Sequence, residues 1–228
     1  MNKRILNLIL YNANVAYEAD MKMYLTAYLK TVPHVSFYFY CYREQEAEVV
    51  IDGHDMFIQG KEGWMPHILR KTMIAIHHSI MELPHFDYLI RSNISTAINY
   101  ANFPYEELSN KDFATTWAFT LNWLSPEHGV PDQRLFGLRF ASGTNIILSR
   151  AAAMFLSTHR LEVDESVQDD VAIGELLSHS PYRLYQLTNF MRYKSDSPII
   201  GFTYRHKSNN RNHDALLMRD LLSRFQSL

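Results

Sequence analysis

Short polar side chains follow an apolar segment near the middle of the chain. Residues 86–91 are mostly apolar, and Asn93, Ser95 and Thr96 come directly after them. Open α/β sheets bind their ligands at the carboxyl ends of buried strands, so these three side chains could hydrogen-bond a bound molecule. They could also be ordinary turn and capping groups. The residues alone leave both interpretations open.

Cationic side chains gather near the carboxyl terminus, in residues 205–207 and at Arg211. Arginine offers a planar fork to phosphate oxygens and lysine a compact charge, so a loop that carries both could hold a diphosphate. Lys71 and Arg91 could join this group. The alternative interpretation is a solvated loop before the last helix.

Two neighbouring acids, Asp169 and Asp170, stand directly before the apolar segment 171–177. A carboxylate can act as a general base, and a second acid beside it can raise its pKa. Two acids at this place also favour the amino terminus of a helix through capping and the helix dipole. Taken alone, the pair is explained by either role.

Histidines and tryptophans give weaker signals. His77 and His78 are adjacent in a predicted helix, where neighbouring side chains point about 100° apart and cannot both face one metal ion. Trp64, Trp117 and Trp123 could stack on sugar or base rings. Packing in the core is the simpler interpretation for each tryptophan.

Composition limits the classes of protein to which the chain can belong. Apolar residues make up 47% of its 228 residues, and a net charge of -2 provides no general attraction for nucleic acid. The single cysteine, Cys41, excludes an intramolecular disulfide and a multi-cysteine zinc site. The apolar run 5–10 is short and is interrupted by Asn7, so we expect no signal peptide, no integral membrane segment and a cytoplasmic location.

The elements that must position these residues alternate between strands and helices. Strands are expected at 4–11, 35–42, 49–51, 56–58, 86–91, 135–140, 143–148 and 199–205. Helices are expected at 18–29 and 66–81, after Ser149, at 171–177 and in a final segment with Leu217, Leu221 and Phe225 on one face. The proline-containing region 97–133 is predicted to form loops and short helices. This order predicts an α/β fold, a three-layer α/β/α sandwich with a mainly parallel sheet, in a single domain over 1–228.

Three motifs follow one another at spacings that match a known family. Residues 88–95 resemble its metal-site strand, residues 141–149 its Ser-Gly acceptor-side segment, and residues 169–174 its acidic pair followed by Val-x-x-Gly. Together they resemble the GT-A fold glycosyltransferases, or nucleotide-diphospho-sugar transferases, of the Fringe-like and β-1,3 type. The Asp-x-Asp motif of that family is replaced here by Asn93-Ile94-Ser95.

The resemblance implies an inverting transfer from a nucleoside-diphosphate sugar to a glycan or other hydroxyl acceptor. Asp170 would be the general base, with Asp169 in its place if the register slips by one. Residues 1–96 would form the donor half and residues 97–228 the acceptor and catalytic half. The donor-binding residues would be Tyr11, Asn12, Lys71, Arg91, Asn93, Ser95, Arg205, Lys207 and Arg211. The acceptor-binding residues would be Ser142, Gly143 and Thr144.

The change in the Asp-x-Asp motif bears on metal dependence. Asn93 and Ser95 offer neutral oxygens, which would bind Mn²⁺ or Mg²⁺ weakly without carboxylates. We therefore expect at most a weakly bound divalent cation, with the cationic loop stabilising the diphosphate leaving group.

Two other functions compete with this one. The loss of Asp-x-Asp is also compatible with an inactive sugar or nucleotide-sugar binding module of the same fold. A nucleotidyltransferase is a second alternative, although that chemistry usually requires Mg²⁺ held by carboxylates.

Overall fold

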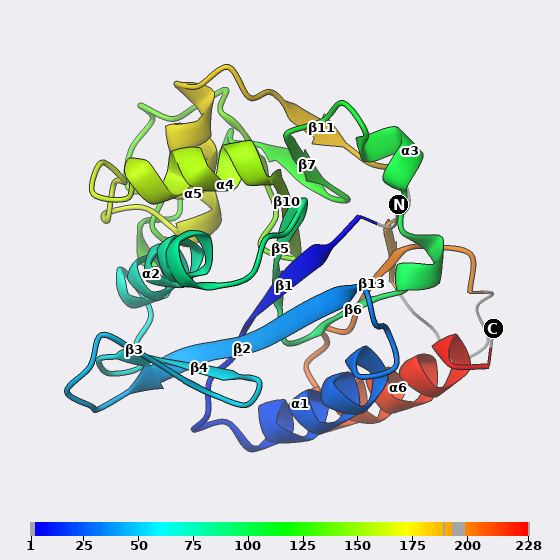
Figure 1. The fold of residues 1–228 in the computed structure, drawn as a ribbon. Helices are drawn as coiled ribbons and strands as arrows, with labels where there is room; N and C mark the ends of the chain where they lie inside the picture. The colour runs from blue at the N-terminus through cyan, green and yellow to red at the C-terminus, as the bar shows by residue number, and fades with distance from the viewer. Residues whose placement is uncertain (1–2, 189, 193–198, 228) are drawn as a thin grey trace.

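An eight-stranded sheet forms the centre of the computed structural model, which describes residues 3–188, 190–192 and 199–227 (Figure 1). In spatial order the strands are β11 (Leu184–Gln186), β7 (Phe113–Thr115), β10 (Asn145–Ser149), β5 (Tyr88–Asn93), β1 (Ile5–Leu10), β2 (Val35–Arg43), β4 (Asp55–Gln59) and β3 (Val49–Asp52). The four strands β5, β1, β2 and β4 run parallel. Their carboxyl ends therefore meet at one edge of the sheet.

Helices cover both faces of this sheet (Figure 1). On one face α1 (Ala16–Leu29) lies beside α6 (Arg211–Phe225). The other face carries α2 (His67–Glu82), α4 (Arg150–Thr158) and α5 (Asp169–Ser178). The single turn α3 (Tyr105–Leu108) and the short 3₁₀ segments Tyr100–Asn102 and Pro126–His128 lie outside these layers. The predicted three-layer α/β/α sandwich is confirmed.

Apolar periodicity explains why these elements form and pack as they do. In β1, Ile5 and Ile9 belong to the core on the α1 side of the sheet, and Leu6 and Leu8 to the core on the α2 side. This strand is apolar on both faces because helices cover both. The predicted stripe of α2 is buried along its length, at Leu69, Met73, Ile76 and Ile80.

The region 97–133 contains strands as well as the predicted loops and short helices. It holds β6 (Thr96–Ile98), β7 and β8 (Ala118–Thr120), each three residues long. Three residues are too few to show an alternating pattern. Their partners are also distant in sequence, so nothing local in the sequence indicates them.

Two predicted strands are shorter than expected. Residues 135–138 form a turn before β9 (Arg139–Ala141), because Gly137 adopts a positive φ of 89° that ends any extended run. At the carboxyl end of the chain, β13 (Thr203–Arg205) occupies only the last part of the expected segment 199–205. The strand expected at 86–91 is displaced to Tyr88–Asn93.

Two pairings outside the parallel strands determine which loops reach the sheet edge. Strand β10 runs antiparallel to β5 with Asn145 opposite Ser92, so the loop before β10 lies at the carboxyl end of β5. Strand β13 pairs with β6 and with β12 (Phe190–Arg192), and places Arg205 opposite Thr96. The acceptor loop and the cationic loop predicted from sequence are thereby brought to the same edge.

None of the helices in the described part of the chain combines the length and the apolar composition that a membrane span requires.

Candidate active site

A cavity of about 870 Å³ opens at this edge of the sheet. Its volume falls in the range of small-molecule sites. It is lined by most of the site residues predicted from sequence, namely Tyr11, Asn12, Lys71, Arg91, Asn93, Ser95, Ser142, Gly143, Asp169, Asp170, Arg205, Lys207 and Arg211. The remaining one, Thr144, lies just behind the lining, where its hydroxyl group accepts a hydrogen bond from Arg205. The structure thus brings the predicted residues together, and their roles stay predictions.

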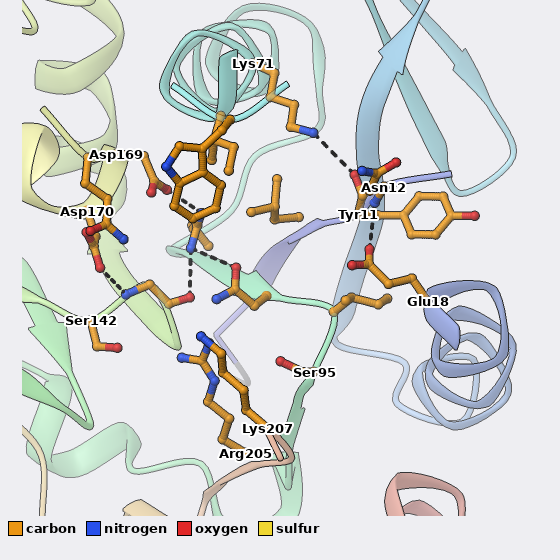
Figure 2. A pocket seen from close by; sticks show the side chains of 18 of the residues that line it. Tyr11, Asn12, Glu18, Lys71, Ser95, Ser142, Asp169, Asp170, Arg205 and Lys207 are labelled. Atoms are coloured by element: carbon orange, nitrogen blue, oxygen red, sulfur yellow. Dashed lines mark hydrogen bonds and ion pairs between the residues drawn. The ribbon is translucent and has the colours of Figure 1, made fainter. Parts of the chain in front are cut away.

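The cavity has two ends of different character (Figure 2). One side carries the acids and the acceptor loop, represented in the view by Asp169, Asp170 and Ser142. The opposite side carries residues after β1 and on α1, represented by Tyr11, Asn12 and Glu18. Arg205 and Lys207 reach the space between them.

A buried ion pair joins β5 to α5 at the acid end. Arg91 Nη2 lies 2.5 Å from Asp169 Oδ2, and the two side chains are 2% and 9% exposed. The same guanidinium donates from Nε to the Tyr40 hydroxyl at 3.2 Å and from Nη1 to the Gly143 carbonyl at 2.7 Å. Burial opposes the charge of Arg91, but Tyr40, Asp169 and Asp170 raise its pKa above the ordinary value. The guanidinium is therefore held by protein groups on all three nitrogens.

Asp170 is held less completely than its neighbour. Its Oδ2 accepts a hydrogen bond of 2.9 Å from the Gly143 N–H, and its buried Oδ1 has no hydrogen-bond partner among the described residues. Burial and then the negative charge of Asp169 raise the pKa of Asp170 to about 7. A carboxyl group that titrates near neutral pH and keeps one oxygen unpaired is suited to accept a proton.

Gly143 allows the two sides of this network to approach. A Cβ atom at this position would lie 2.9 Å from Arg91 Nη1, 3.5 Å from Asp170 Oδ2 and 3.6 Å from Asn93 Nδ2. The first of these contacts is shorter than van der Waals contact, so a side chain here would displace the guanidinium. The absence of a side chain at Gly143 therefore lets Arg91 and Asp170 approach the same backbone segment.

The residues that replace Asp-x-Asp do not fit a tightly held divalent cation. Asn93 Oδ1 accepts from Arg91 Nη1 at 3.3 Å, so a positive guanidinium lies beside the oxygen that would ligate the metal. No group of three or more His, Cys, Asp or Glu side chains that could hold a metal ion occurs within residues 3–188, 190–192 and 199–227. The site offers only neutral oxygens at this strand end.

The cationic loop combines paired and unpaired charges. Arg211 Nη1 lies 2.5 Å from Asp214 and donates to the His206 carbonyl at 2.9 Å. Lys207 is exposed, and in the described part of the chain its ammonium makes no hydrogen bond or ion pair. Partial desolvation and the charges of Arg205 and Arg211 lower the pKa of Lys207. The charges of Arg205 and Arg211 therefore act on Lys207 from either side of the loop, and an anion bound beside Lys207 would offset their repulsion.

The end of the cavity near β1 contains carboxylates that the sequence prediction missed. Glu18 Oε2 accepts from the Asn12 N–H at 2.7 Å, and burial raises the pKa of Glu18. Glu62 lies 2.6 Å from the buried Lys71 Nζ, which also donates to the Tyr11 carbonyl at 3.4 Å. Lys71 is thus already paired, and its predicted contact with donor phosphates stays a prediction.

An aromatic wall at the acid end was also not predicted as part of the site. All three tryptophans line the cavity, together with Phe119 and Phe140. Trp123 is 38% exposed and packs edge-on against Phe119 at 6.0 Å between ring centroids. The wall is assembled by the pairing of β8 with β9, which is antiparallel and places Phe119 opposite Phe140. No local pattern in the sequence indicates this pairing.

Comparisons with known proteins support the fold. No family model and no curated protein sequence matches the chain. Among solved structures, a glycosyltransferase involved in the glycosylation of the major capsid of PBCV-1 matches with a TM-score of 0.54 and 10% identity, over 94% of this chain and 98% of that chain. The chain therefore has a GT-A-like fold, as the sequence predicted. The Fringe-like type stays a prediction.

Two further structures are similar at lower TM-scores. The 2-C-methyl-D-erythritol 4-phosphate cytidylyltransferase from Thermus thermophilus matches with a TM-score of 0.48 and 10% identity, over 98% of this chain and all of that chain. The galactosyltransferase LgtC, in complex with donor and acceptor sugar analogs, matches with a TM-score of 0.46 and 8% identity, over 93% and 95% of the two chains.

Proposed function

We propose that the chain is a glycosyltransferase that moves a sugar from a nucleoside-diphosphate sugar to a glycan or other hydroxyl acceptor, with inversion at the anomeric carbon. The observation that carries the proposal is Asp170 Oδ1, which has no hydrogen-bond partner among the described residues. It is buried at one end of a cavity whose other end lies at Tyr11 and Asn12. The cationic side chains reach the space between the two ends, where the diphosphate of such a donor would lie (Figure 2).

In this proposal Asp170 removes the proton from the acceptor hydroxyl. The acceptor oxygen attacks the anomeric carbon, the bond from that carbon to the phosphate oxygen breaks, and the bond electrons leave with the diphosphate. Attack on the face opposite the leaving group inverts the anomeric configuration. The pKa of Asp170, raised to about 7 by burial and by Asp169, is well matched to proton transfer at neutral pH.

The cationic loop would stabilise the leaving diphosphate. Arg205 and Lys207 line the cavity, and their charges act where negative charge develops. Because Asn93 and Ser95 provide only neutral oxygens, we propose that transfer depends weakly or not at all on a divalent cation.

The two ends of the cavity would divide recognition between donor and acceptor. Tyr11 and Asn12 would contact the nucleotide, and the Glu18 carboxylate beside them can accept hydrogen bonds from its hydroxyl or amino groups. The loop of Ser142, Gly143 and Thr144 would contact the acceptor. The aromatic wall at that end offers faces on which a sugar ring can stack.

The first test is donor binding. Thermal-shift measurements against a panel of nucleoside-diphosphate sugars, with Mn²⁺ and with EDTA, should identify a donor that raises the melting temperature in both conditions. Failure of every donor in both conditions would contradict the proposal.

The second test is turnover with that donor. Release of the nucleoside diphosphate should persist in EDTA and fall about 10²- to 10⁴-fold in Asp170→Asn. Asp20→Asn, an exposed acid on α1, is the matched control and should keep wild-type turnover. Saturable donor binding without turnover on any acceptor would indicate a binding module instead. Consumption of a nucleoside triphosphate with release of pyrophosphate would indicate a nucleotidyltransferase.

A further inference from the structure

We infer that Arg91 is a positioning residue that gives two adjacent carboxyl groups different roles. It fixes Asp169 in an ion pair and leaves Asp170 as the group that exchanges a proton. The inference rests on the proposed function for the use of that proton. It assigns to Arg91 a task different from the phosphate contact expected from the sequence.

The contacts of Arg91 explain how one acid is fixed. The guanidinium is 1% exposed and lies on the central strand β5. Its ion pair of 2.5 Å with Asp169 is one of several contacts, since Tyr40 and the Gly143 carbonyl hold the other nitrogens. A planar guanidinium held at several points cannot turn toward a second carboxylate without breaking existing bonds.

The geometry of α5 explains why the other acid is left free. Asp169 and Asp170 are consecutive in the first turn of α5, and consecutive helical side chains point about 100° apart. Asp170 therefore turns toward the acceptor loop, where the Gly143 N–H binds only Oδ2. Gly143 is bound from both sides, by Arg91 at its carbonyl and by Asp170 at its N–H, which ties the two acids into one arrangement.

The charges around Asp170 determine how the variants should behave. Asp169 acts on it from α5, Arg91 from β5 and Lys207 from the loop after β13. The negative charge of Asp169 raises the pKa of Asp170, and the positive charge of Arg91 lowers it. Removing one partner should therefore move the titration of Asp170 in the direction opposite to removing the other.

The experiment is a carboxyl ¹³C NMR titration of the protein without ligands, with the Asp170 resonance assigned by its loss in Asp170→Asn. Asp169→Asn should lower the titration midpoint of Asp170 by about 1 to 3 pH units, because a like charge is lost and Arg91 remains. Arg91→Gln should move the first protonation step of the pair to higher pH by about 1 to 3 units. Arg91→Lys keeps the positive charge but lacks the planar guanidinium, and it should give a smaller shift in the same direction. This variant replaces Arg91→Gln in the test if Arg91→Gln does not fold.

Tyr40→Phe is the matched control, since it removes one hydrogen bond of Arg91 and no charge. The titration midpoint of Asp170 in Tyr40→Phe should stay within about 0.5 pH unit of the wild-type value, a small fraction of the shift expected from a lost charge. A midpoint that stays constant in the charge variants, or moves the same way in Asp169→Asn and the Arg91 variants, would overturn the inference. The titration uses neither donor nor acceptor. A protein that binds no nucleoside-diphosphate sugar but shows opposite shifts would refute the proposed function alone.

Discussion

The acid end of the cavity and the cationic loop after β13 hold their charges in different ways. At the acid end Arg91 and Asp169 are buried and paired with each other. In the loop Lys207 is exposed, and partial desolvation together with the charges of Arg205 and Arg211 lowers its pKa. The first arrangement stabilises a fixed geometry within the protein, whereas the second leaves positive charge that a bound anion can compensate.

The largest effect that separates the two regions should be on stability. Asp169→Asn leaves the Arg91 guanidinium buried beside a neutral amide and should lower the free energy of unfolding by about 3 to 5 kcal/mol. Lys207→Ala removes an exposed charge and should change it by no more than about 0.5 kcal/mol. Urea unfolding measures both. Similar small losses in the two variants would remove the distinction between the regions.

The next effect concerns the pH dependence of stability at the acid end. The pKa of Asp170 is raised to about 7 in the folded protein, above about 3.9 in an unfolded chain. The folded state binds this proton more tightly, so the stabilisation is present below about pH 4 and is lost as the pH rises through 7. Asp170→Asn cannot ionise and should exceed the wild type in free energy of unfolding by about 2 to 4 kcal/mol at pH 8, with little difference near pH 4. Unfolding at both pH values checks this, and an equal difference at both would contradict the raised pKa.

A smaller effect should appear in the cationic loop on donor binding. Lys207→Ala should weaken binding of the nucleoside-diphosphate sugar about 10- to 100-fold, because one charge-assisted hydrogen bond to phosphate is lost. Isothermal titration calorimetry measures the change. Lys30→Ala, an exposed lysine that does not line the cavity, is the control and should bind as the wild type does. An equal loss of affinity for the nucleoside without phosphates would show that Lys207 does not act on the diphosphate.

The smallest effect concerns the aromatic wall, which lies at the acid end but, unlike the buried ion pair there, is partly exposed. Trp123→Ala should raise the acceptor KM about 3- to 10-fold with a smaller change in kcat, since one stacking surface is lost. Trp123→Phe should retain much of the affinity. Phe136→Ala, an exposed aromatic side chain outside the cavity lining, is the control. An unchanged KM in Trp123→Ala would place the acceptor elsewhere.

The layered fold could be predicted because its main elements are long and periodic. The apolar run of β1 and the stripe of α2 each identify one element without reference to the rest of the chain. The short strands β6, β7 and β8 could not be predicted in this way, because each is defined by pairing with a strand far away in sequence. The same cause produced the error at residues 135–138, where the turn at Gly137 ends an apolar run.

The membership of the site could be predicted better than its internal contacts. Motifs located the acids and the acceptor loop, a cluster of positive charges located the cationic loop, and the structure places all three at one cavity. The pairing of Arg91 with Asp169 joins residues 78 positions apart, and side-chain type alone suggested phosphate for Arg91. The tryptophans were considered as stacking surfaces but left out of the predicted site, because core packing is the simpler interpretation of a tryptophan in a sequence.

The antiparallel strand β10 has a consequence for the protein during its synthesis. It lies between β5 and β7, so one edge of β5 has no strand partner until β10 has been made. Roughly 50 residues separate the two strands, which corresponds to about 3 to 10 seconds of translation at about 5 to 20 residues per second. During that interval the uncovered edge can pair with another chain. The late synthesis of the strand that brings Gly143 to Asp170 thus leaves the nascent chain open to aggregation until β10 itself has left the ribosome.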